Sequence, residues 1–322
     1  MLHLEHALAQ ASADGHESPS HLPQSTSVEV ILNERSGLRD KTGVPQLLEG
    51  LFKDRGIEVR VTNNKDPTRL YQQAEAAAKR SEVIVAAGGD GTANTVASAA
   101  IARHRTLGVL PLGTLNHFAR DLGIPIELEE AVDTIAGGFT TLVDVGEVNS
   151  RIFLNNSTLG LYPSIVHERQ KQQRLGHGKW PAFAWSAITV FRRYPFLDVK
   201  LKADGKSVES RTPFVFIGNN VYAMEGFKIG IRDRLDAGTL SVYMTLRIGR
   251  WGLFRLAVRA LLGRLRYERD FVSLLTDDVS IETKRKRVRV ARDGEVEVIA
   301  TPLQYLIHRK ALRVLAPKPD KL

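Results

Sequence analysis

The sequence predicts an α/β domain with a mostly parallel sheet, followed by a second, predominantly antiparallel β domain. Segments of strand and helix character alternate from Val28 to about Thr141, which is the pattern of parallel β–α–β units. Strand-like runs then follow one another, with hairpin signals at Asp204-Gly205 and Asp293-Gly294. A chain of 322 residues is long enough for two such domains.

The composition excludes several classes of protein. The chain is 43% hydrophobic and 25% charged and contains no Cys, so a disulfide-stapled secreted scaffold, a thiolate zinc site and a Cys nucleophile are excluded. No apolar run approaches the roughly 18 residues of a membrane-spanning helix, and the first residues do not resemble a signal peptide. We therefore expect a cytoplasmic protein. The formal charge of +9 suits an anionic partner such as nucleic acid, nucleotide or an acidic membrane.

The first part of the chain consists of a leader and the α/β domain. Residues 1–26 lack periodicity, and we expect them to be a mobile leader. The α/β domain is expected over residues 27–142. Its predicted strands are Val28–Leu32, Glu58–Thr62, VIVAAG and LGVLPLG, and its predicted helices are about Val44–Phe52, Pro67 through AEAAAKR, TANTVASAAIAR and LEEAVDTIAGG.

The β-rich domain is expected over residues 143–317, with a tail over 318–322. Its strand-like runs are LVDVGEVN, RIFLNNSTLG, FLDVKLKADGKSVES, TPFVFIGNN, LSVYMTL and RKRVRVARDGEVEVI. Two helical stretches interrupt them, at roughly Ser164–Tyr194 and Trp251–Arg269.

The segment AAGGDGTANTV, residues 86–96, is the strongest local feature. A buried-type strand ends at glycines and a helix is expected to begin just beyond Thr92, which leaves backbone N–H groups free to bind phosphate. Gly88, Gly89 and Gly91 would let the backbone approach a ligand. Thr92 could cap the helix or donate to a phosphate, and Asp90 could hold a metal or orient a water. The chain has no P-loop motif. A tight βα turn without a ligand is the alternative.

Two further segments carry weaker signals. In LGVLPLGTLNHFARDLGIP, residues 107–125, Thr114 and Asn116 lie where a strand gives way to a helix. Two such loops at neighbouring strand ends would flank one crevice, although a plain helix capped by Asn116 is equally consistent. The turn Asp293-Gly294-Glu295 follows a basic strand and, taken alone, is an ordinary hairpin turn.

Together, GGDGTAN, PLGTLNHFARDLGIP and the late DGE resemble the diacylglycerol-kinase catalytic domain family, which includes the sphingosine kinases and the bacterial lipid kinases. The resemblance extends from about Val28 to Pro317. NAD kinases and phosphofructokinases also carry GGDGT or a close variant, so the PLGT-x-N-x-F-A string is what narrows the choice. In this chain His117 replaces the usual Asp of that string, and Asn33-Glu34-Arg35-Ser36-Gly37 lacks the usual Pro.

The resemblance implies a sandwich-like second domain, a nucleotide cleft between the domains and ATP-dependent phosphorylation of a lipid hydroxyl, diacylglycerol- or sphingoid-like. It implies ATP contacts at Asn33, Ser36, Gly37, Thr62, Gly88, Gly89, Asp90, Gly91, Thr92, Asn94 and Thr114. It further implies that Asp293 is the general base and Glu295 its acidic partner near Mg²⁺. Related sphingosine kinases make Asp90 a rival base.

A structural magnesium site is also implied by the resemblance. The family's D-G-x-L string reads Asp236-Ala237-Gly238-Thr239-Leu240 here, with the carboxylate displaced by one residue. The implied ligands are Asp236 and the carbonyls of Arg234 and Thr239.

The distribution of charged and apolar residues indicates which partners the protein could bind. The stretch from Trp251 to Arg269 is basic and amphipathic, which suits peripheral binding to an anionic membrane surface or, alternatively, packing with a solvated basic face. The apolar segment that begins at Lys179 suits an acyl chain or a core. The basic cluster KRKRVRVAR lacks interleaved aromatic residues, so we expect no nucleic-acid partner. The alternatives to a lipid kinase are an NAD kinase-like enzyme and a catalytically silent lipid-binding protein. The lipid and the oligomeric state stay open.

Overall fold

A computed structural model describes residues 8, 27–34, 43–160, 163, 196–222, 232–244 and 272–318. The helices expected at Ser164–Tyr194 and Trp251–Arg269, and nearly all of the expected leader, lie outside these residues. The chain forms two compact units. The first is Met1–Val145, Arg234–Gly238 and His308–Leu322, and the second is Gly146–Asp233 and Thr239–Ile307. The sequence predicts one boundary after residue 142, whereas two later segments, Arg234–Gly238 and His308–Leu322, also belong to the first unit.

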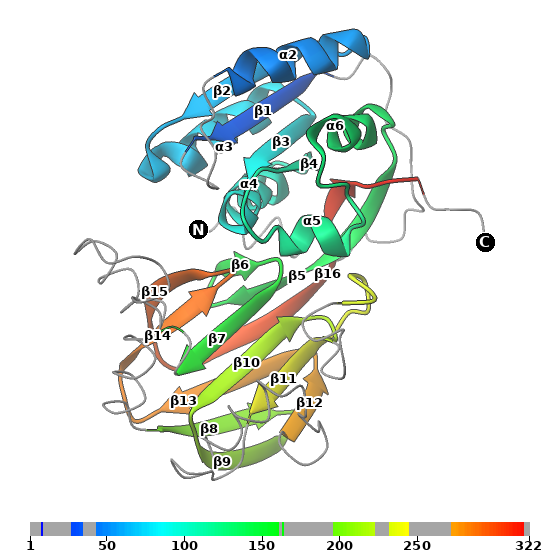
Figure 1. Ribbon diagram of the computed structural model, residues 1–322. Coiled ribbons are helices and arrows are strands. Elements are labelled where there is room, and N and C mark those ends of the chain that lie inside the picture. The colour runs from blue at the N-terminus through cyan, green and yellow to red at the C-terminus, as the bar shows by residue number, and fades with distance from the viewer. Residues whose placement is uncertain are drawn as a thin grey trace, which may run out of the picture. The chain divides into compact units, whose positions relative to one another are not determined.

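The first unit is built on a parallel sheet (Figure 1). Strands β1 (Val28–Asn33), β2 (Val59–Asn64), β3 (Val83–Gly88) and β4 (Thr106–Pro111) lie in the order β2-β1-β3-β4. Every neighbouring pair among them is parallel. β3 and β4 are buried along their whole length, as expected for apolar strands of a parallel sheet that is covered on both faces. The predicted parallel α/β domain is confirmed.

Helices cover this sheet in two pairs. α3 (Leu70–Arg80), preceded by the 3₁₀ turn η1 (Pro67–Arg69), packs against α4 (Asp90–Ala102), and α2 (Val44–Asp54) contacts α6 (Leu128–Ala136). Because β1 leads through α2 to β2 on one side and β3 leads through α4 to β4 on the other, right-handed crossovers place α2 and α4 on opposite faces. The strand order therefore reverses between β1 and β3, which is where open α/β sheets bind ligands.

The second unit is a two-layer antiparallel β structure. One layer has the order β12-β11-β10-β7-β14-β15, and the other contains β13, β8 and β9 together with the first part of β16. The strands from β5 onward have the following bounds: β5 (Thr140–Val148), β6 (Arg151–Phe153), β7 (Asn156–Gly160), β8 (Leu197–Ala203), β9 (Lys206–Thr212), β10 (Phe214–Asn219), β11 (Leu240–Met244), β12 (Val272–Thr276), β13 (Asp278–Thr283), β14 (Arg287–Arg292), β15 (Glu295–Ala300) and β16 (Leu303–Leu315). β5 begins in the first unit, and β16 ends in it.

Both predicted Asp-Gly hairpins form, β8 with β9 and β14 with β15. Asp204 and Gly205 have φ values of 49° and 70°, and Asp293 and Gly294 have 45° and 85°. Two consecutive positive φ values are what a tight hairpin turn requires, and they explain why Asp-Gly occurs at both places.

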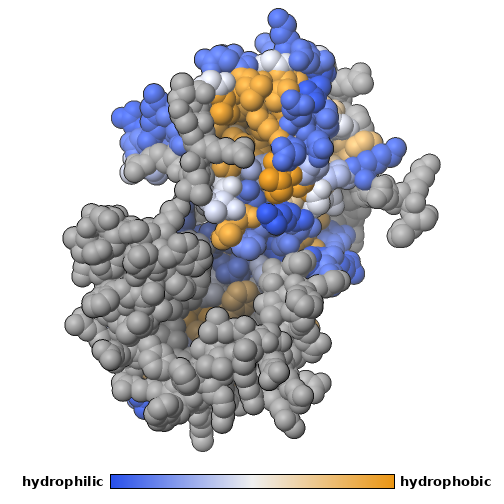
Figure 2. Space-filling view, in the orientation of Figure 1, coloured by the Kyte–Doolittle hydropathy of each residue, from blue (hydrophilic) through white to orange (hydrophobic). Residues whose placement is uncertain are grey.

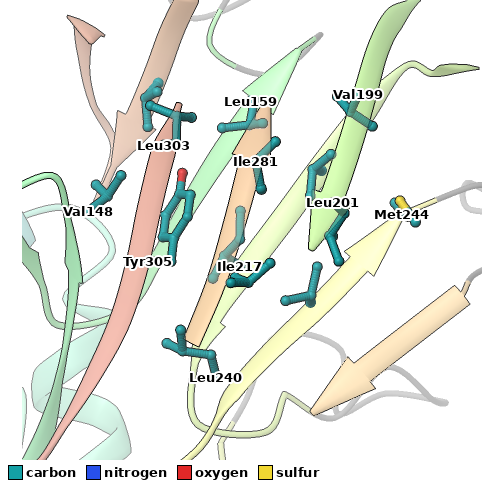
Figure 3. Packing of buried hydrophobic residues seen from close by; sticks show 14 of the residues in the cluster. Val148, Leu159, Val199, Leu201, Ile217, Leu240, Met244, Ile281, Leu303 and Tyr305 are labelled. Carbon is teal, nitrogen blue, oxygen red and sulfur yellow. The ribbon is translucent and has the colours of Figure 1, made fainter. Parts of the chain in front are cut away.

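The core of the second unit lies between its two layers. Figure 3 shows side chains such as Leu201, Ile281 and Tyr305 directed into the space that Leu159 and Ile217 share. Alternate residues of β8, β10, β11, β13, β14 and β16 enter this core, as the pleat of a half-buried strand dictates. One polar pair is buried within it, the hydroxyls of Tyr305 and Ser157, 3.0 Å apart. Burial raises the pKa of the Tyr305 hydroxyl well above its usual range, so this group is a neutral hydrogen-bonding partner.

The described helices and exposed side chains give two properties of the molecule. No helix within the described part of the chain is both long and apolar enough to cross a membrane. Figure 2 shows apolar residues among charged ones on the visible face of the first unit. The exposed large apolar side chains of this unit include Leu47 on α2 and Leu115 after β4.

Tyr305→Phe tests the buried polar pair. The Ser157 hydroxyl would lose its partner inside the core, and we expect a loss of about 1–3 kcal/mol in the free energy of unfolding, measured by urea denaturation. The double variant Tyr305→Phe/Ser157→Ala removes both hydroxyls and should recover part of that loss. If Tyr305→Phe were as stable as the unchanged protein, the hydrogen bond between Tyr305 and Ser157 would not stabilise the core.

Candidate functional site

The carboxyl ends of β1 and β3 bring together residues that the sequence analysis singled out. Asn33 ends β1, and Gly88 ends the neighbouring β3. The Asn33 side chain donates a 2.9 Å hydrogen bond from Nδ2 to Oγ1 of Thr92, in the first turn of α4. Thr92 is buried. The hydroxyl accepts this bond and keeps its own hydrogen to donate. The structure therefore joins two of the predicted nucleotide-binding residues at the point where the strand order reverses.

No side chain of the N-cap residue caps the start of α4. α4 begins at Asp90, earlier than expected, and its N-cap residue is Gly89. A helix N-terminus with a glycine N-cap is a place where backbone N–H groups can bind an anion. A Cβ at Gly88 would lie 2.4 Å from Oγ1 of Thr92, so only glycine fits there.

A second loop, from Leu112 to Asn116, contacts the first through its backbone. A Cβ at Gly113 would lie 2.3 Å from Cα of Gly89. Asn116 holds this loop. Its Oδ1 accepts from the N–H of Gly113 at 3.0 Å, and its Nδ2 donates to the carbonyls of Pro111 and Gly113 at 3.0 and 3.1 Å. Asn116 has a φ of 53° and its side chain does not cap the following helix α5 (His117–Asp121); instead it fixes the turn before that helix.

Asp90 connects the two loops. Its carboxylate oxygens accept hydrogen bonds from the backbone N–H groups of His117 at 3.2 Å and Phe118 at 3.0 Å. These are first-turn donors of α5, so Asp90 caps that helix from 27 residues away. The sequence predicts that Asp90 contacts ATP, holds a metal or orients a water, and it does not predict this bond. No local pattern indicates the bond, because it joins residues that are 27 and 28 positions apart.

The other predicted nucleotide-binding residues occupy varied positions. Gly91 and Asn94 lie in the first turns of α4, and Thr114 is exposed in the second loop. Thr62 pairs with Ile31 within the β2–β1 ladder. Ser36 and Gly37 lie outside the described residues.

In the second unit, Asp293 supports a turn. Its carboxylate accepts hydrogen bonds from the N–H groups of Leu154, Asn155 and Asn156, at 2.8, 2.8 and 3.1 Å. Its own N–H donates to the Asn156 carbonyl at 3.0 Å. The hairpin between β14 and β15 is thus attached to the turn between β6 and β7, and the carboxylate has a fixed orientation.

The acidic residues after Asp293 have different environments. The Glu295 residue has an exposed surface, yet the surroundings of its carboxyl group, through desolvation and the neighbouring carboxylates of Glu297 and Asp293, raise its pKa against the opposing effect of Arg292. Glu297 forms ion pairs with Arg292 and, at 2.9 Å, with Arg151. Asp293, Glu295 and Glu297 thus form an acidic group beside Arg292 and Arg151.

The predicted magnesium ligands are the Asp236 carboxylate and the carbonyls of Arg234 and Thr239. The Asp236 carboxylate lies 3.0 Å from Nε of Arg234 in an ion pair that is largely exposed. These two residues belong to the first unit and Thr239 to the second. In the regions that the structure describes, no three His, Asp or Glu side chains come together as a metal site would require. Because two of the three predicted ligands are main-chain carbonyls, the magnesium site at Asp236, Arg234 and Thr239 stays a prediction.

Asn116→Asp tests how the second loop is held. The variant would lose both donors and place a carboxylate against the carbonyls of Pro111 and Gly113. We expect the free energy of unfolding to fall by at least about 2 kcal/mol, measured by urea denaturation. His117→Ala is the matched control, since it keeps the backbone N–H that bonds to Asp90 and removes only an exposed side chain. Equal stability of the two variants would show that Asn116 does not hold the loop.

Comparisons with known proteins agree with this geometry. Residues 27–148 match the diacylglycerol kinase catalytic domain, and residues 162–316 match the YegS C-terminal NAD kinase beta sandwich-like domain. A diacylglycerol kinase of Staphylococcus aureus (strain MRSA252) is 32% identical over 224 residues, covering 68% of this chain and 69% of the relative. One from Bacillus subtilis (strain 168) is 27% identical over 297 residues, covering 90% and 96%.

The fold is also similar to that of a solved protein. The crystal structure of a diacylglycerol kinase from Bacillus anthracis (strain Sterne) superposes with a TM-score of 0.66 at 20% identity, covering 94% of this chain and 100% of that chain. At this identity the likeness concerns the fold alone. The family resemblance expected from the glycine loop, the PLGTLNHFA string and the late DGE is confirmed by the two family models and by the S. aureus relative, and the chain belongs to the diacylglycerol kinase family.

Proposed function

We propose that the protein is an ATP-dependent lipid kinase that transfers the γ-phosphate to the hydroxyl of a diacylglycerol- or sphingoid-like lipid. The observation that carries this proposal is the pair of loops after β3 and β4, joined by the Asp90 carboxylate, in a chain of the diacylglycerol kinase family. Because the S. aureus and B. subtilis relatives are named diacylglycerol kinases, diacylglycerol is the first acceptor to test.

The phosphates of ATP would lie against the start of α4. Uncovered N–H groups at a helix N-terminus favour anions, and the loop carries glycine where the backbone must come close. Preorganised donors of this kind stabilise the charge that spreads over the transferred phosphoryl group. Mg²⁺ would enter with ATP, because this ion is usually held by substrate phosphates and only one or two carboxylates.

The acceptor hydroxyl needs a base, and Asp293 is the residue we assign. The lipid oxygen bonds to the γ-phosphorus, the bond from that phosphorus to the bridging oxygen of ADP breaks, and the hydroxyl proton passes to the carboxylate. The three backbone bonds to Asp293 give its carboxylate one orientation. Asp90 is the rival base, although both of its oxygens already accept backbone N–H bonds.

One observation favours a second candidate. The family model that matches residues 162–316 is described as NAD kinase-like, so NAD is a possible acceptor in place of a lipid. A catalytically silent lipid-binding protein would phosphorylate neither a lipid nor NAD.

Consumption of ATP should therefore be measured with diacylglycerol, monoacylglycerol, a sphingoid base and NAD. The lipids should be presented in vesicles with anionic lipid, since we also propose that the basic stretch Trp251–Arg269 binds such surfaces. Turnover only with NAD, or with no acceptor, would overturn the proposal.

Paired variants separate the two carboxylates. Asp293→Asn removes the base, which is typically worth about 10²–10⁴-fold in rate, so kcat should fall while ATP affinity stays near normal. Asp90→Asn would disturb the bonds to α5 and should weaken ATP binding as well as turnover. The readouts are kcat by phospholipid product and ATP affinity by calorimetry. Near-normal turnover of Asp293→Asn, with Asp90→Asn inactive at normal ATP affinity, would make Asp90 the base.

A further inference from the structure

Arg232 is a buried arginine outside every motif that the sequence analysis used. Only 3% of its surface is exposed. Its Nη1 donates to the carbonyls of Leu154 at 2.7 Å and Asn219 at 3.1 Å, and its Nη2 donates to Oδ1 of Asn155 at 2.7 Å. The guanidinium also lies over the ring of Tyr222, with its Cζ 5.3 Å from the ring centroid. Burying a charged guanidinium costs free energy unless hydrogen bonds compensate for the lost hydration. The three acceptors around Arg232 provide this compensation.

Two of the three acceptors, the Leu154 carbonyl and Oδ1 of Asn155, belong to the turn that Asp293 holds. The peptide group between Leu154 and Asn155 is shared by both charged residues. Its carbonyl accepts from Nη1 of Arg232 at 2.7 Å and from Nδ2 of Asn219 at 2.9 Å. Its N–H donates to Oδ1 of Asp293 at 2.8 Å. Donors on a carbonyl polarise the amide and strengthen its N–H as a donor. A single peptide group therefore links a buried cation to the Asp293 carboxylate.

We propose that Arg232 is a positioning residue for Asp293. It fixes the turn Leu154–Asn156 from one side, while the Asp293 carboxylate binds the N–H groups of the same turn from the other. The functional part of this inference rests on the proposed role of Asp293 as the base. Arg232 acts through the peptide group, and a small displacement of a reacting carboxylate is enough to lower the rate substantially.

Arg232→Met tests the proposal, because methionine fills much of the same space without the donors. We expect kcat to fall by about 100-fold while the KM for ATP changes little, since the ATP loops belong to the first unit. Arg232→Lys, which keeps the charge and can bond one carbonyl, should recover part of the rate. Arg211→Met is the matched control: it removes an exposed arginine of β9 that lies over the Phe196 ring and should leave kcat unchanged.

A double-variant cycle decides whether Arg232 acts through Asp293. If it does, Arg232→Met lowers kcat no further in the Asp293→Asn background than Asp293→Asn does alone. Additive losses would overturn the proposal, as would an Arg232→Met loss seen only in the KM for ATP. Urea denaturation confirms that each variant is folded, and Arg232→Lys replaces Arg232→Met in the cycle if the latter does not fold.

The Asn155 backbone amide gives a readout that needs no activity. Its proton resonance in NMR reports the bond to Asp293, and we expect Arg232→Lys and Asp293→Asn both to move it upfield, with Arg211→Met leaving it in place. If the unchanged protein phosphorylates no acceptor, the proposed function fails, but this shift still tests the link between Arg232 and Asp293. A resonance unmoved by Arg232→Lys would overturn the inference.

Discussion

The Asp90 carboxylate makes the hydrogen bonds on which the arrangement of the candidate site depends. It accepts the N–H groups of His117 and Phe118, and so attaches the loop after β4 to the loop after β3. The two loops also meet through Gly89 and Gly113, where a Cβ at Gly113 would lie 2.3 Å from Cα of Gly89. Because Asn116 fixes the second loop internally, hydrogen bonds hold both loops in place beside the start of α4. If the loops bind phosphate as proposed, this arrangement lowers the cost of binding.

Two other carboxylates, those of Asp144 and Asp293, also accept hydrogen bonds from backbone N–H groups of distant segments. Asp144 of β5 is almost fully buried and accepts from the N–H groups of Gly238 at 2.6 Å and Lys310 at 2.7 Å. These bonds attach the segments Arg234–Gly238 and His308–Leu322 to the first unit. Asp293 does the same for the turn Leu154–Asn156 in the second unit. In each case a carboxylate satisfies backbone donors of a segment distant in the sequence, as buried polar groups require.

Local patterns in the sequence were sufficient to predict most of the fold. VIVAAG predicts β3 because a strand covered on both faces must be apolar throughout, and Asp-Gly predicts both hairpins because their turns need positive φ values. The glycines after β3 likewise predict the loop at the start of α4, which we propose binds phosphate. Motif reading did not predict the hydrogen bonds of Asp90, Asp293 and Arg232, because each joins residues far apart in the chain. Such contacts depend on tertiary packing, and a residue such as Arg232 has no local signature that separates it from a surface arginine.

Hydrogen exchange of backbone amides, measured with and without Mg²⁺-ATP, tests the nucleotide site most directly. If ATP binds where the two loops meet, amides over residues 88–94 and 112–118 gain protection on addition of ATP, and those of the second-unit core strands do not. Gly89→Val, which crowds the approach to the α4 N-terminus, should abolish the gain in a folded protein. The assignment would be contradicted if ATP did not increase amide protection over residues 88–94 and 112–118. It would also be contradicted if Gly89→Val showed the same increase.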